Sequence, residues 1–288
     1  MHTTLETLIS AERLRAALAT GQAVTVIDTR FDLADTGAGE ASWRAGHLPG
    51  SIYLHLDRDL AGPTTGPDGV FKGRHPLPAR ADFAATLGRC GITPATPVVV
   101  LDAQGGMYAA RLWWMLRWMG HSSVAVLDGG VAAWTTAGGA RVTDIAPPRP
   151  AAPYPERASL AGTIDAAALA ATLGRVRLLD ARAGERFRGE VEPLDSVAGH
   201  IPGALNRYFK DNLDADGRFK PAAQLRQDYE ALLGARPAEQ AVHQCGSGVT
   251  ACHNLLAMEH AGLTGSVLYP GSWSEWSADP ARPVARGG

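Results

Sequence analysis

Residues 241–258 read AVHQCGSGVTACHNLLAM. The short apolar run at 241–243 predicts a buried strand, and the Leu- and Ala-containing stretch from Cys252 onward favours a helix. Between them, Gly246 and Gly248 indicate a tight loop. A strand, a glycine-containing loop and a helix in this order predict a parallel sheet with helices on its faces.

The first half of the chain repeats motifs of the second half. An apolar run that ends in an acid, VTVID at 24–28, precedes GHLPG at 46–50. The second half has VRLLD at 176–180 and then GHIPG at 199–203. From the acid to the histidine the spacing is 19 residues in the first half and 20 in the second. Such internal similarity indicates a duplicated domain.

Further along, the two halves match at a constant offset of 142 residues. This offset places Ala103 opposite Cys245, and Ala110 opposite Cys252. The first half therefore lacks a thiol at the position of Cys245. The apolar runs show no alternation of period 2, as expected for strands that are covered on both faces. We expect an α/β fold of two like domains, each with a mostly parallel sheet flanked by helices.

A proline-rich segment separates the two copies. Residues 146–155 read APPRPAAPYP, which predicts extended chain because proline cannot continue a helix. We expect an N-terminal, non-catalytic domain over residues 1–143, a linker over 144–158 and a C-terminal, catalytic domain over 159–288.

The composition narrows the classes of partner. Charged residues make up 19% of the chain and the formal net charge is −2, which gives no indication of a nucleic-acid or anionic membrane partner. No run approaches the roughly 18–20 apolar residues of a membrane span, and the first residues do not resemble a secretory signal. We expect a cytoplasmic protein with no metal and no cofactor.

Three cysteines are present, and one of them has the setting of a reactive thiol. Cys245 follows a predicted strand and precedes a predicted helix, where backbone N–H groups and the helix dipole favour an anion. Such settings lower a cysteine pKa from about 8.5 to roughly 3.5–7.5. The alternative is a small buried apolar residue, which is the reading we adopt for Cys90 and Cys252.

Three motifs together resemble the tandem-domain rhodanese family. They are CGSGVTA at 245–251, the two Gly-His-x-Pro-Gly motifs and GSWSEW at 271–276. The family comprises thiosulfate and 3-mercaptopyruvate sulfurtransferases, and the resemblance covers roughly residues 5–280. It implies two rhodanese-like domains with an active site in the cleft between them. It also implies Cys245 as the nucleophile and substrate-binding positions at Gly246, Gly248, Val249 and Thr250 of the loop.

The sulfur donor is indicated by the residues after the cysteine. Family members that prefer thiosulfate usually have basic side chains there, whereas this chain has Gly246 and Ser247, which resembles the 3-mercaptopyruvate branch. That branch implies a proton relay of Ser247, His75 and Asp57, although Asp59 is an alternative to Asp57. A histidine suits such proton transfer because its pKa lies near neutrality.

The same resemblance implies a carboxylate-binding arginine. Arg186 matches the family's substrate arginine, and a guanidinium binds a carboxylate through two parallel hydrogen bonds. Mercaptopyruvate enzymes often have a second arginine about nine residues further on, where this chain has Leu194 and Asp195. Strict specificity for mercaptopyruvate is therefore open, and thiosulfate is the alternative donor.

Two acid and histidine pairs occur in both halves, namely Asp28 with His47 and Asp180 with His200. Since only one half has the nucleophile, we interpret both pairs as polar latches between a loop and a strand end.

The resemblance implies a two-step transfer of sulfur. Cys245 takes sulfur from a small-molecule donor as a persulfide, and cyanide, a small thiol or a thioredoxin-like dithiol removes it. A cysteine phosphatase is disfavoured because its Cys-x5-Arg loop would need arginine at Ala251. A non-catalytic binding module is the alternative of another class, and it predicts a degraded loop in the second half.

Overall fold

The chain divides into two compact units. The computed structural model describes residue 5 and residues 7–288. The first unit extends to Ala61 and also contains Pro78–Leu160 and Asp214–Phe219. The second unit contains Gly62–Leu77, Ala161–Leu213 and Lys220–Gly288. Each unit is thus built mostly from one half of the chain, but segments 62–77 and 214–219 belong to the unit of the other half.

The first unit contains a five-stranded sheet in which every strand pair is parallel. The strand order is β1-β5-β4-β2-β3. The strands are β1 (Leu8–Ile9), β2 (Thr25–Asp28), β3 (Ile52–Tyr53), β4 (Val98–Leu101) and β5 (Val124–Leu127). The helices are α1 (Ala11–Ala19), α2 (Ala38–Ala45), α3 (Leu56–Asp59), α4 (Arg80–Arg89), α5 (Ala109–Trp118) and α6 (Gly130–Thr136).

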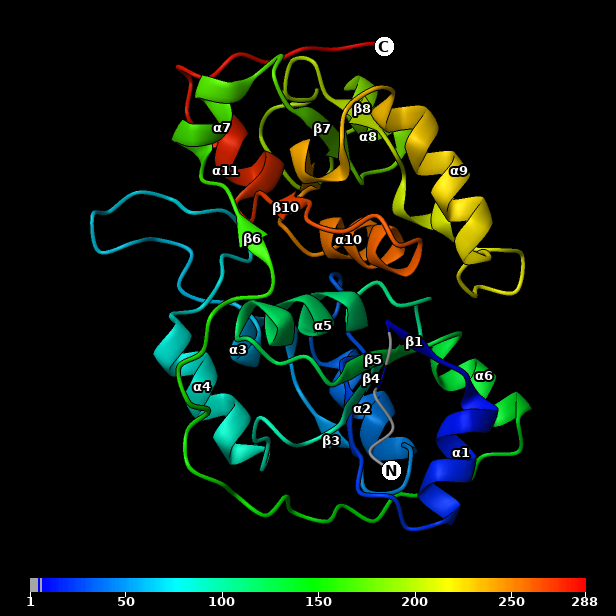
Figure 1. Ribbon diagram of the computed structural model, residues 1–288. Helices are drawn as coiled ribbons and strands as arrows, with labels where there is room; N and C mark the ends of the chain where they lie inside the picture. Colours follow the sequence, from blue (N-terminus) through cyan, green and yellow to red (C-terminus); the bar gives the residue numbers. More distant parts are fainter. Residues whose placement is uncertain (1–4, 6) are drawn as a thin grey trace. The chain divides into compact units, whose positions relative to one another are not determined.

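The second unit repeats this topology with the strand order β6-β10-β9-β7-β8, again all parallel. The strands β6, β7, β8 and β10 are labelled in Figure 1. Its strands are β6 (Gly162–Thr163), β7 (Arg177–Asp180), β8 (Leu205–Asn206), β9 (Ala241–Gln244) and β10 (Val267–Leu268). Its helices are α7 (Ala166–Thr172), α8 (Gly184–Arg188), α9 (Ala222–Leu233), α10 (Ala251–His260) and α11 (Ser272–Ala278), with short 3-10 helices η1 (Phe209–Asn212) and η2 (Ala238–Gln240). The predicted α/β class and duplication are confirmed.

Helix caps show how local sequence sets the same elements in both units. Ser10 caps α1 by accepting a hydrogen bond from the Arg13 N–H at 3.3 Å. Asp165 caps α7 in the same way, accepting from the Ala168 N–H at 2.8 Å. Ser10 directly follows the edge strand β1, and Asp165 lies two residues after the edge strand β6. In each unit the chain therefore turns from strand to helix within a few residues.

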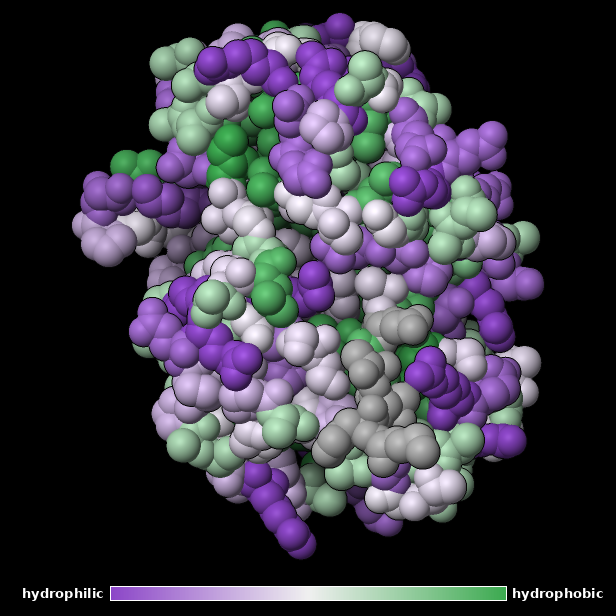
Figure 2. Space-filling view, viewed as in Figure 1, coloured by the Kyte–Doolittle hydropathy of each residue, from purple (hydrophilic) through white to green (hydrophobic). Residues whose placement is uncertain are grey.

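The apolar runs form the middle of each sheet. All residues of β4 and β9 are buried, as expected for central strands with helices on both faces. Apolar side chains also gather around Trp134 in the first unit and around Trp273 and Trp276 in the second. The face drawn in Figure 2 is mainly hydrophilic or neutral, with apolar residues in small patches. Among the described residues, no helix has the length and apolarity needed to cross a membrane.

The strand register corrects one part of the sequence alignment. Asp28 pairs with Leu101 in the first sheet, and its counterpart Asp180 pairs with Gln244 in the second. Leu101 therefore corresponds to Gln244, an offset of 143 residues, whereas α5 and α10 begin at an offset of 142. The expectation that Ala103 stands opposite Cys245 is wrong. Asp102 holds that position, because the loop after β4 is one residue longer than the loop after β9.

The proline-rich segment runs in extended conformation along α4. The Ala151 N–H donates to the Gly88 carbonyl at 2.8 Å, and the Tyr154 N–H donates to the Ala84 carbonyl at 2.9 Å. Tyr154 is buried in this position. These contacts attach the segment to the first unit.

Candidate active site

Cys245 is the first residue after β9, at the carboxyl edge of the central strand of the second sheet. Its side chain and backbone are 2% exposed. The Cys245 N–H donates to Ser272 Oγ at 3.1 Å, and its carbonyl accepts from the Trp273 N–H at 3.0 Å. The next carbonyl, that of Gly246, accepts from the Ser274 N–H at 2.9 Å. The first turn of α11 therefore fixes the backbone that carries the thiol.

Ser272 has a backbone conformation that fits this supporting role. Its φ is 54°, and among the described residues it alone combines a positive φ with a side chain. Its Oγ accepts from Cys245 and donates to the Tyr269 carbonyl at 2.9 Å. The first unit has Gly130 at the corresponding position, also with a φ of 54°. A serine there bears backbone strain, and in exchange it supplies a hydrogen-bond acceptor for the cysteine N–H.

The loop between Cys245 and α10 requires a glycine at one position. Gly248 has a φ of 77°, and a Cβ atom there would lie 2.3 Å from the Pro270 carbonyl oxygen. The tight loop places Gly246, Val249 and Thr250 in one turn directly before the N-terminus of α10. Their roles in substrate binding stay predictions.

The corresponding loop of the first unit encloses the Asp102 side chain. The Asp102 carboxylate accepts hydrogen bonds from the backbone N–H groups of Gln104, Gly106, Tyr108 and Ala109 at 2.8–2.9 Å. Asp102 is 1% exposed. A carboxylate with this many backbone donors is a filled anion site at the start of a helix. Asp102 was not predicted from the sequence, because the offset of 142 residues places Ala103 rather than Asp102 opposite Cys245.

Ser247 and His75 lie in direct contact within the second unit. The distance between Ser247 Oγ and His75 Nδ1 is 2.8 Å, and both residues are 7% exposed. His75 comes from segment 62–77, which belongs to this unit although it lies in the first half of the chain. Asp57 lies on α3 of the first unit, where its N–H donates to His55 Nδ1 at 3.1 Å. The structure thus brings together two of the three predicted relay residues, and the role of Asp57 stays a prediction.

Two guanidinium groups lie against the loop beside Cys245. A Cβ atom at Gly246 would lie 2.8 Å from Arg74 Nη2 and 3.5 Å from Arg186 Nη1. Arg186 was expected here, on α8, but Arg74 was not. Arg74 Nε and Nη2 donate to the Asp195 carboxylate at 3.1 and 3.3 Å. Its neighbour in sequence, His75, was the one signal that could have directed attention to Arg74.

Resident acids neutralise much of this positive charge. Arg186 Nη2 donates to Glu192 at 2.6 Å and lies 3.5 Å from Asp195. Glu192 also pairs with Arg182 at 3.4 Å. Burial raises the pKa of Glu192, but the hydrogen bond and the charge of Arg186 outweigh burial and hold that pKa below its ordinary value. Glu192 is therefore ionised at neutral pH.

The predicted latches exist, but their partners were assigned wrongly. Asp180 pairs with Arg182 at 2.7 Å rather than with His200, and Asp28 pairs with Arg30 at 2.8 Å rather than with His47. Each arginine follows its acid by two residues, so the same strand end supplies both charges.

The two arginines, rather than the histidines, complete the latches. Arg182 Nη2 donates to the Gly199 carbonyl at 2.7 Å, and Arg30 Nη2 donates to the Gly46 carbonyl at 3.1 Å. Arg182 also lies over the Trp273 ring at 4.8 Å. Burial opposes the charge on Arg182, but Asp180 and Glu192 outweigh burial and raise the pKa of its guanidinium. Arg182 thus connects the latch of the second unit to the acids near Cys245.

The other cysteines pack in the interior, as expected. Cys252 is buried on α10, and its thiol donates to the Gly248 carbonyl at 3.4 Å. Cys90 caps the end of α4, and burial raises its pKa to about 11. A thiol with that pKa carries almost no thiolate at neutral pH. Within the described part of the chain, no cluster of three or more His, Cys, Asp or Glu side chains could hold a metal ion.

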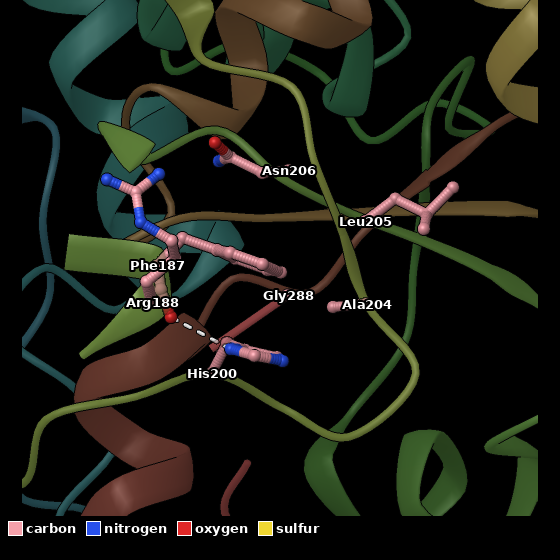
Figure 3. Close-up of a pocket in the computed structure, with 7 residues that line it drawn as sticks. All are labelled: Phe187, Arg188, His200, Ala204, Leu205, Asn206 and Gly288. Carbon is pink, nitrogen blue, oxygen red and sulfur yellow. Dashed lines mark hydrogen bonds between the residues drawn. The ribbon is translucent and has the colours of Figure 1, made fainter. Parts of the chain in front are cut away.

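One open cavity of the second unit is lined by residues other than Cys245. It has a volume of about 320 Å³ and lies beside β8 (Figure 3). The His200 ring stacks on Phe187 with centroids 3.9 Å apart, and His200 Nδ1 lies 2.8 Å from the Phe187 carbonyl oxygen. The lining residues are Phe187, Arg188, His200, Ala204, Leu205, Asn206 and Gly288. Cys245 is not among them, so this cavity does not contain the predicted nucleophile.

Known proteins resemble the chain over nearly its whole length. A family model described as "Rhodanese-like domain" matches residues 10–137 and 165–279. A Pseudomonas aeruginosa protein named "Probable 3-mercaptopyruvate sulfurtransferase" is 48% identical over 283 residues, which cover 97% of this chain and 98% of that protein. The mouse protein named "Thiosulfate sulfurtransferase" is 32% identical, with 97% and 95% covered. The solved 3-mercaptopyruvate sulfurtransferase from Leishmania major has a TM-score of 0.82 at 28% identity and covers 95% of this chain and 74% of its own.

Proposed function

The chain belongs to the rhodanese-like domain family and is a sulfurtransferase, and we propose that it moves sulfur from 3-mercaptopyruvate through a persulfide on Cys245. The acceptor in this proposal is cyanide, a small thiol or a thioredoxin-like dithiol. The observation that carries the proposal is the position of Cys245, which stands where the first unit holds a carboxylate with four backbone N–H groups.

In the first step, the Cys245 thiolate attacks the sulfur atom of the donor. A new S–S bond forms, the donor's C–S bond breaks, and its electron pair passes to the carbon skeleton as the enolate of pyruvate. The enolate takes up a proton and leaves as pyruvate, while the donor's thiol proton is released. Charge and atoms balance: one thiolate and one thiol donor give one persulfide anion and pyruvate.

Ser247 and His75 are suited to move that proton. Their contact at 2.8 Å allows His75 to take a proton from, or return one to, the Ser247 hydroxyl beside the nucleophile. In our proposal this pair delivers a proton to the enolate carbon, and a part for Asp57 in the relay stays a prediction. In the second step the acceptor attacks the outer sulfur, the S–S bond breaks, and Cys245 leaves as the thiolate.

The loop after β9 is suited to hold the charged sulfur. It begins at the same strand register as the loop after β4 and likewise ends at a helix N-terminus. In the first unit, peptide N–H groups of that loop bind the Asp102 carboxylate. Preorganised N–H donors of this kind stabilise an anion without reorganisation during the reaction.

The nature of the donor follows from the side chains around Cys245. Gly246 and Ser247 carry no charge, and the Arg186 guanidinium lies beside Gly246, which together favour 3-mercaptopyruvate. Thiosulfate is the second candidate, because two guanidinium groups near Gly246 could attract a dianion. A non-catalytic binding module predicts a degraded loop, whereas the second loop keeps its thiol, its glycines and its supporting contacts.

Steady-state transfer of sulfur to cyanide tests the proposal. Wild type and Cys245→Ser are compared with 3-mercaptopyruvate and with thiosulfate as donors. We expect wild type to show a higher kcat/KM with mercaptopyruvate and the variant to show no transfer with either donor. A higher kcat/KM with thiosulfate would reject the donor assignment, and full activity in the variant would reject the nucleophile.

A further inference from the structure

We propose that Arg74 is a second donor-binding residue, which shares the donor's carboxylate with Arg186, and that Asp195 positions it. This inference rests on the proposed function, since it assumes a sulfur donor that carries a carboxylate. Arg74 lies far from Arg186 and Cys245 in sequence, but the three residues belong to the same unit.

Arg74 reaches the loop through contacts that fix its backbone. The Arg74 N–H donates to Ser274 Oγ at 3.1 Å, while the Ser274 N–H donates to the Gly246 carbonyl at 2.9 Å. One residue of α11 therefore holds both Arg74 and the residue after the nucleophile. Gly73 packs equally tightly, because a Cβ atom there would lie 2.8 Å from the Gly271 carbonyl oxygen. A backbone held this closely gives the Arg74 side chain a defined starting point.

Asp195 fixes the other end of the side chain. Its two oxygens accept from Arg74 Nε and Nη2 at 3.1 and 3.3 Å, which is a two-point contact along one edge of the guanidinium. Asp195 also lies 3.5 Å from Arg186 Nη2, so it stands between the two arginines. The Asp195 side chain is only 7% exposed, whereas those of Arg74 and Arg186 are 22% and 17% exposed. The carboxylate is thus buried behind two guanidinium groups that retain access to solvent.

The acids contact only two of the three nitrogen atoms of each guanidinium group, which carries five N–H donors in all. Arg74 donates to Asp195 from Nε and Nη2, and Arg186 donates to Glu192 and Asp195 from the same two atoms. The positions of Arg74 Nη2 and Arg186 Nη1 at 2.8 and 3.5 Å from a Cβ atom at Gly246 put both groups beside the residue that follows the nucleophile. A donor carboxylate bound there would place the rest of a three-carbon skeleton next to Cys245.

The charges near this position favour a single negative charge on the donor. Arg74 and Arg186 face Asp195 and Glu192, and Arg182 faces Asp180 and Glu192. Three arginines and three acids leave no net charge in this cluster. A monoanionic carboxylate is therefore easier to accommodate than a dianion, because the resident acids have already used part of the positive potential.

Ligand binding without turnover tests the role of Arg74. Calorimetry measures the Kd of pyruvate, and of its neutral amide, with Cys245→Ser protein that also carries Arg74→Met, Arg74→Lys or Arg188→Met. We expect Arg74→Met to weaken pyruvate binding about 10- to 100-fold with little change for the amide. Arg74→Lys should lie between, since it keeps the charge but loses the two-point contact with Asp195. Arg188 is partly exposed on the same helix as Arg186 and pairs with Glu190, so Arg188→Met should bind like the parent.

Different results reject different statements. Equal loss of pyruvate and amide binding in Arg74→Met would reject carboxylate recognition and indicate a structural role for the Arg74 and Asp195 pair. Unchanged pyruvate binding would reject the inference outright, and thermal unfolding of each variant shows whether it is folded. If instead the protein with intact arginines transfers no sulfur from mercaptopyruvate, the proposed function fails. If wild type does transfer sulfur from mercaptopyruvate but Arg74→Met does not weaken pyruvate binding, the proposed function stands and only the role of Arg74 is rejected.

Discussion

Asp102 and Cys245 occupy the same position in the two halves of the chain, each as the first residue after the central strand of its sheet. In the first unit the side chain at this position is a carboxylate, bound by four backbone N–H groups. In the second unit it is a thiol, which in the proposed reaction carries negative charge as a thiolate and then as a persulfide. In our proposal the duplicated loop thus provides a site for negative charge at the same strand end of each copy.

Replacing Asp102 by Asn should destabilise the first unit. The asparagine amide keeps one acceptor oxygen, but its NH2 group would face backbone N–H groups that now bind the second carboxylate oxygen. Because these groups are buried, we expect a loss of about 3 kcal/mol in the free energy of unfolding. Asp32→Asn is the matched control, because the exposed Asp32 also accepts from backbone N–H groups, those of Ala34 and Asp35. Calorimetric unfolding measures both variants. Equal stability of the two would contradict the importance of the filled loop.

Substitutions at Ser272 should separate backbone strain from hydrogen bonding. Ser272→Ala keeps the φ of 54° but leaves the buried Cys245 N–H without its acceptor, so we expect a loss of about 1–3 kcal/mol in stability and lower kcat. Ser272→Gly removes the strain, which offsets about 1 kcal/mol of that loss, but it lowers kcat as well. Urea unfolding and sulfur transfer to cyanide measure the two effects. A fully active Ser272→Gly variant would show that the hydrogen bond does not orient the nucleophile.

Gly248 should tolerate alanine much less well than a glycine of similar φ on the surface. Gly248→Ala adds a close contact with the Pro270 carbonyl to the cost of the positive φ, and we expect a loss of at least about 3 kcal/mol and of sulfur transfer. Gly217 has a φ of 73° and open space around it, so Gly217→Ala should lose only about 1 kcal/mol. The comparison of their unfolding midpoints in urea is decisive. Similar losses in the two variants would argue against tight packing at the loop.

His243 should make stability depend on pH. Burial lowers its pKa to about 3, whereas an unfolded histidine titrates near 6.5. Between these values the unfolded chain binds one proton more, so the free energy of unfolding rises with pH by about 1.4 kcal/mol per pH unit from this group. In the first sheet, Val100 holds the position in β4 that His243 holds in β9, so valine is the natural replacement for His243.

His243→Val should therefore reduce the slope of stability against pH between pH 4.5 and 6, whatever its effect on absolute stability. Urea unfolding at several pH values measures that slope for both proteins. An unchanged slope in the variant would show that His243 is protonated in the folded state.

Spacing and composition were sufficient to predict the α/β class, the duplication and the loop that carries Cys245, because these depend on short-range patterns. The register of the duplicated loop was not predictable to the residue. A single extra residue before Ala109 shifts the alignment, and only the hydrogen-bonded pairing of Asp28 with Leu101 reveals it.

The polar partners were harder to predict than the fold. Asp28 and Asp180 each form an ion pair with the arginine two residues later in the sequence. The histidines of the Gly-His-x-Pro-Gly motifs were more conspicuous in the sequence, but they are not the partners. Arg74 lies more than a hundred residues from Asp195, and no local pattern links the two. Contacts of this kind arise from packing of distant segments, which a single sequence does not encode in its spacing.

Mass analysis of the sulfur-loaded protein tests the persulfide most directly. Wild type and Cys245→Ser are exposed to 3-mercaptopyruvate without an acceptor, and peptides containing Cys90, Cys245 and Cys252 are analysed before and after cyanide is added. We predict one added sulfur atom on Cys245 in wild type, lost on addition of cyanide, and no added sulfur in the variant. Added sulfur on Cys90 or Cys252, or loading of the Cys245→Ser variant, would contradict a persulfide on Cys245.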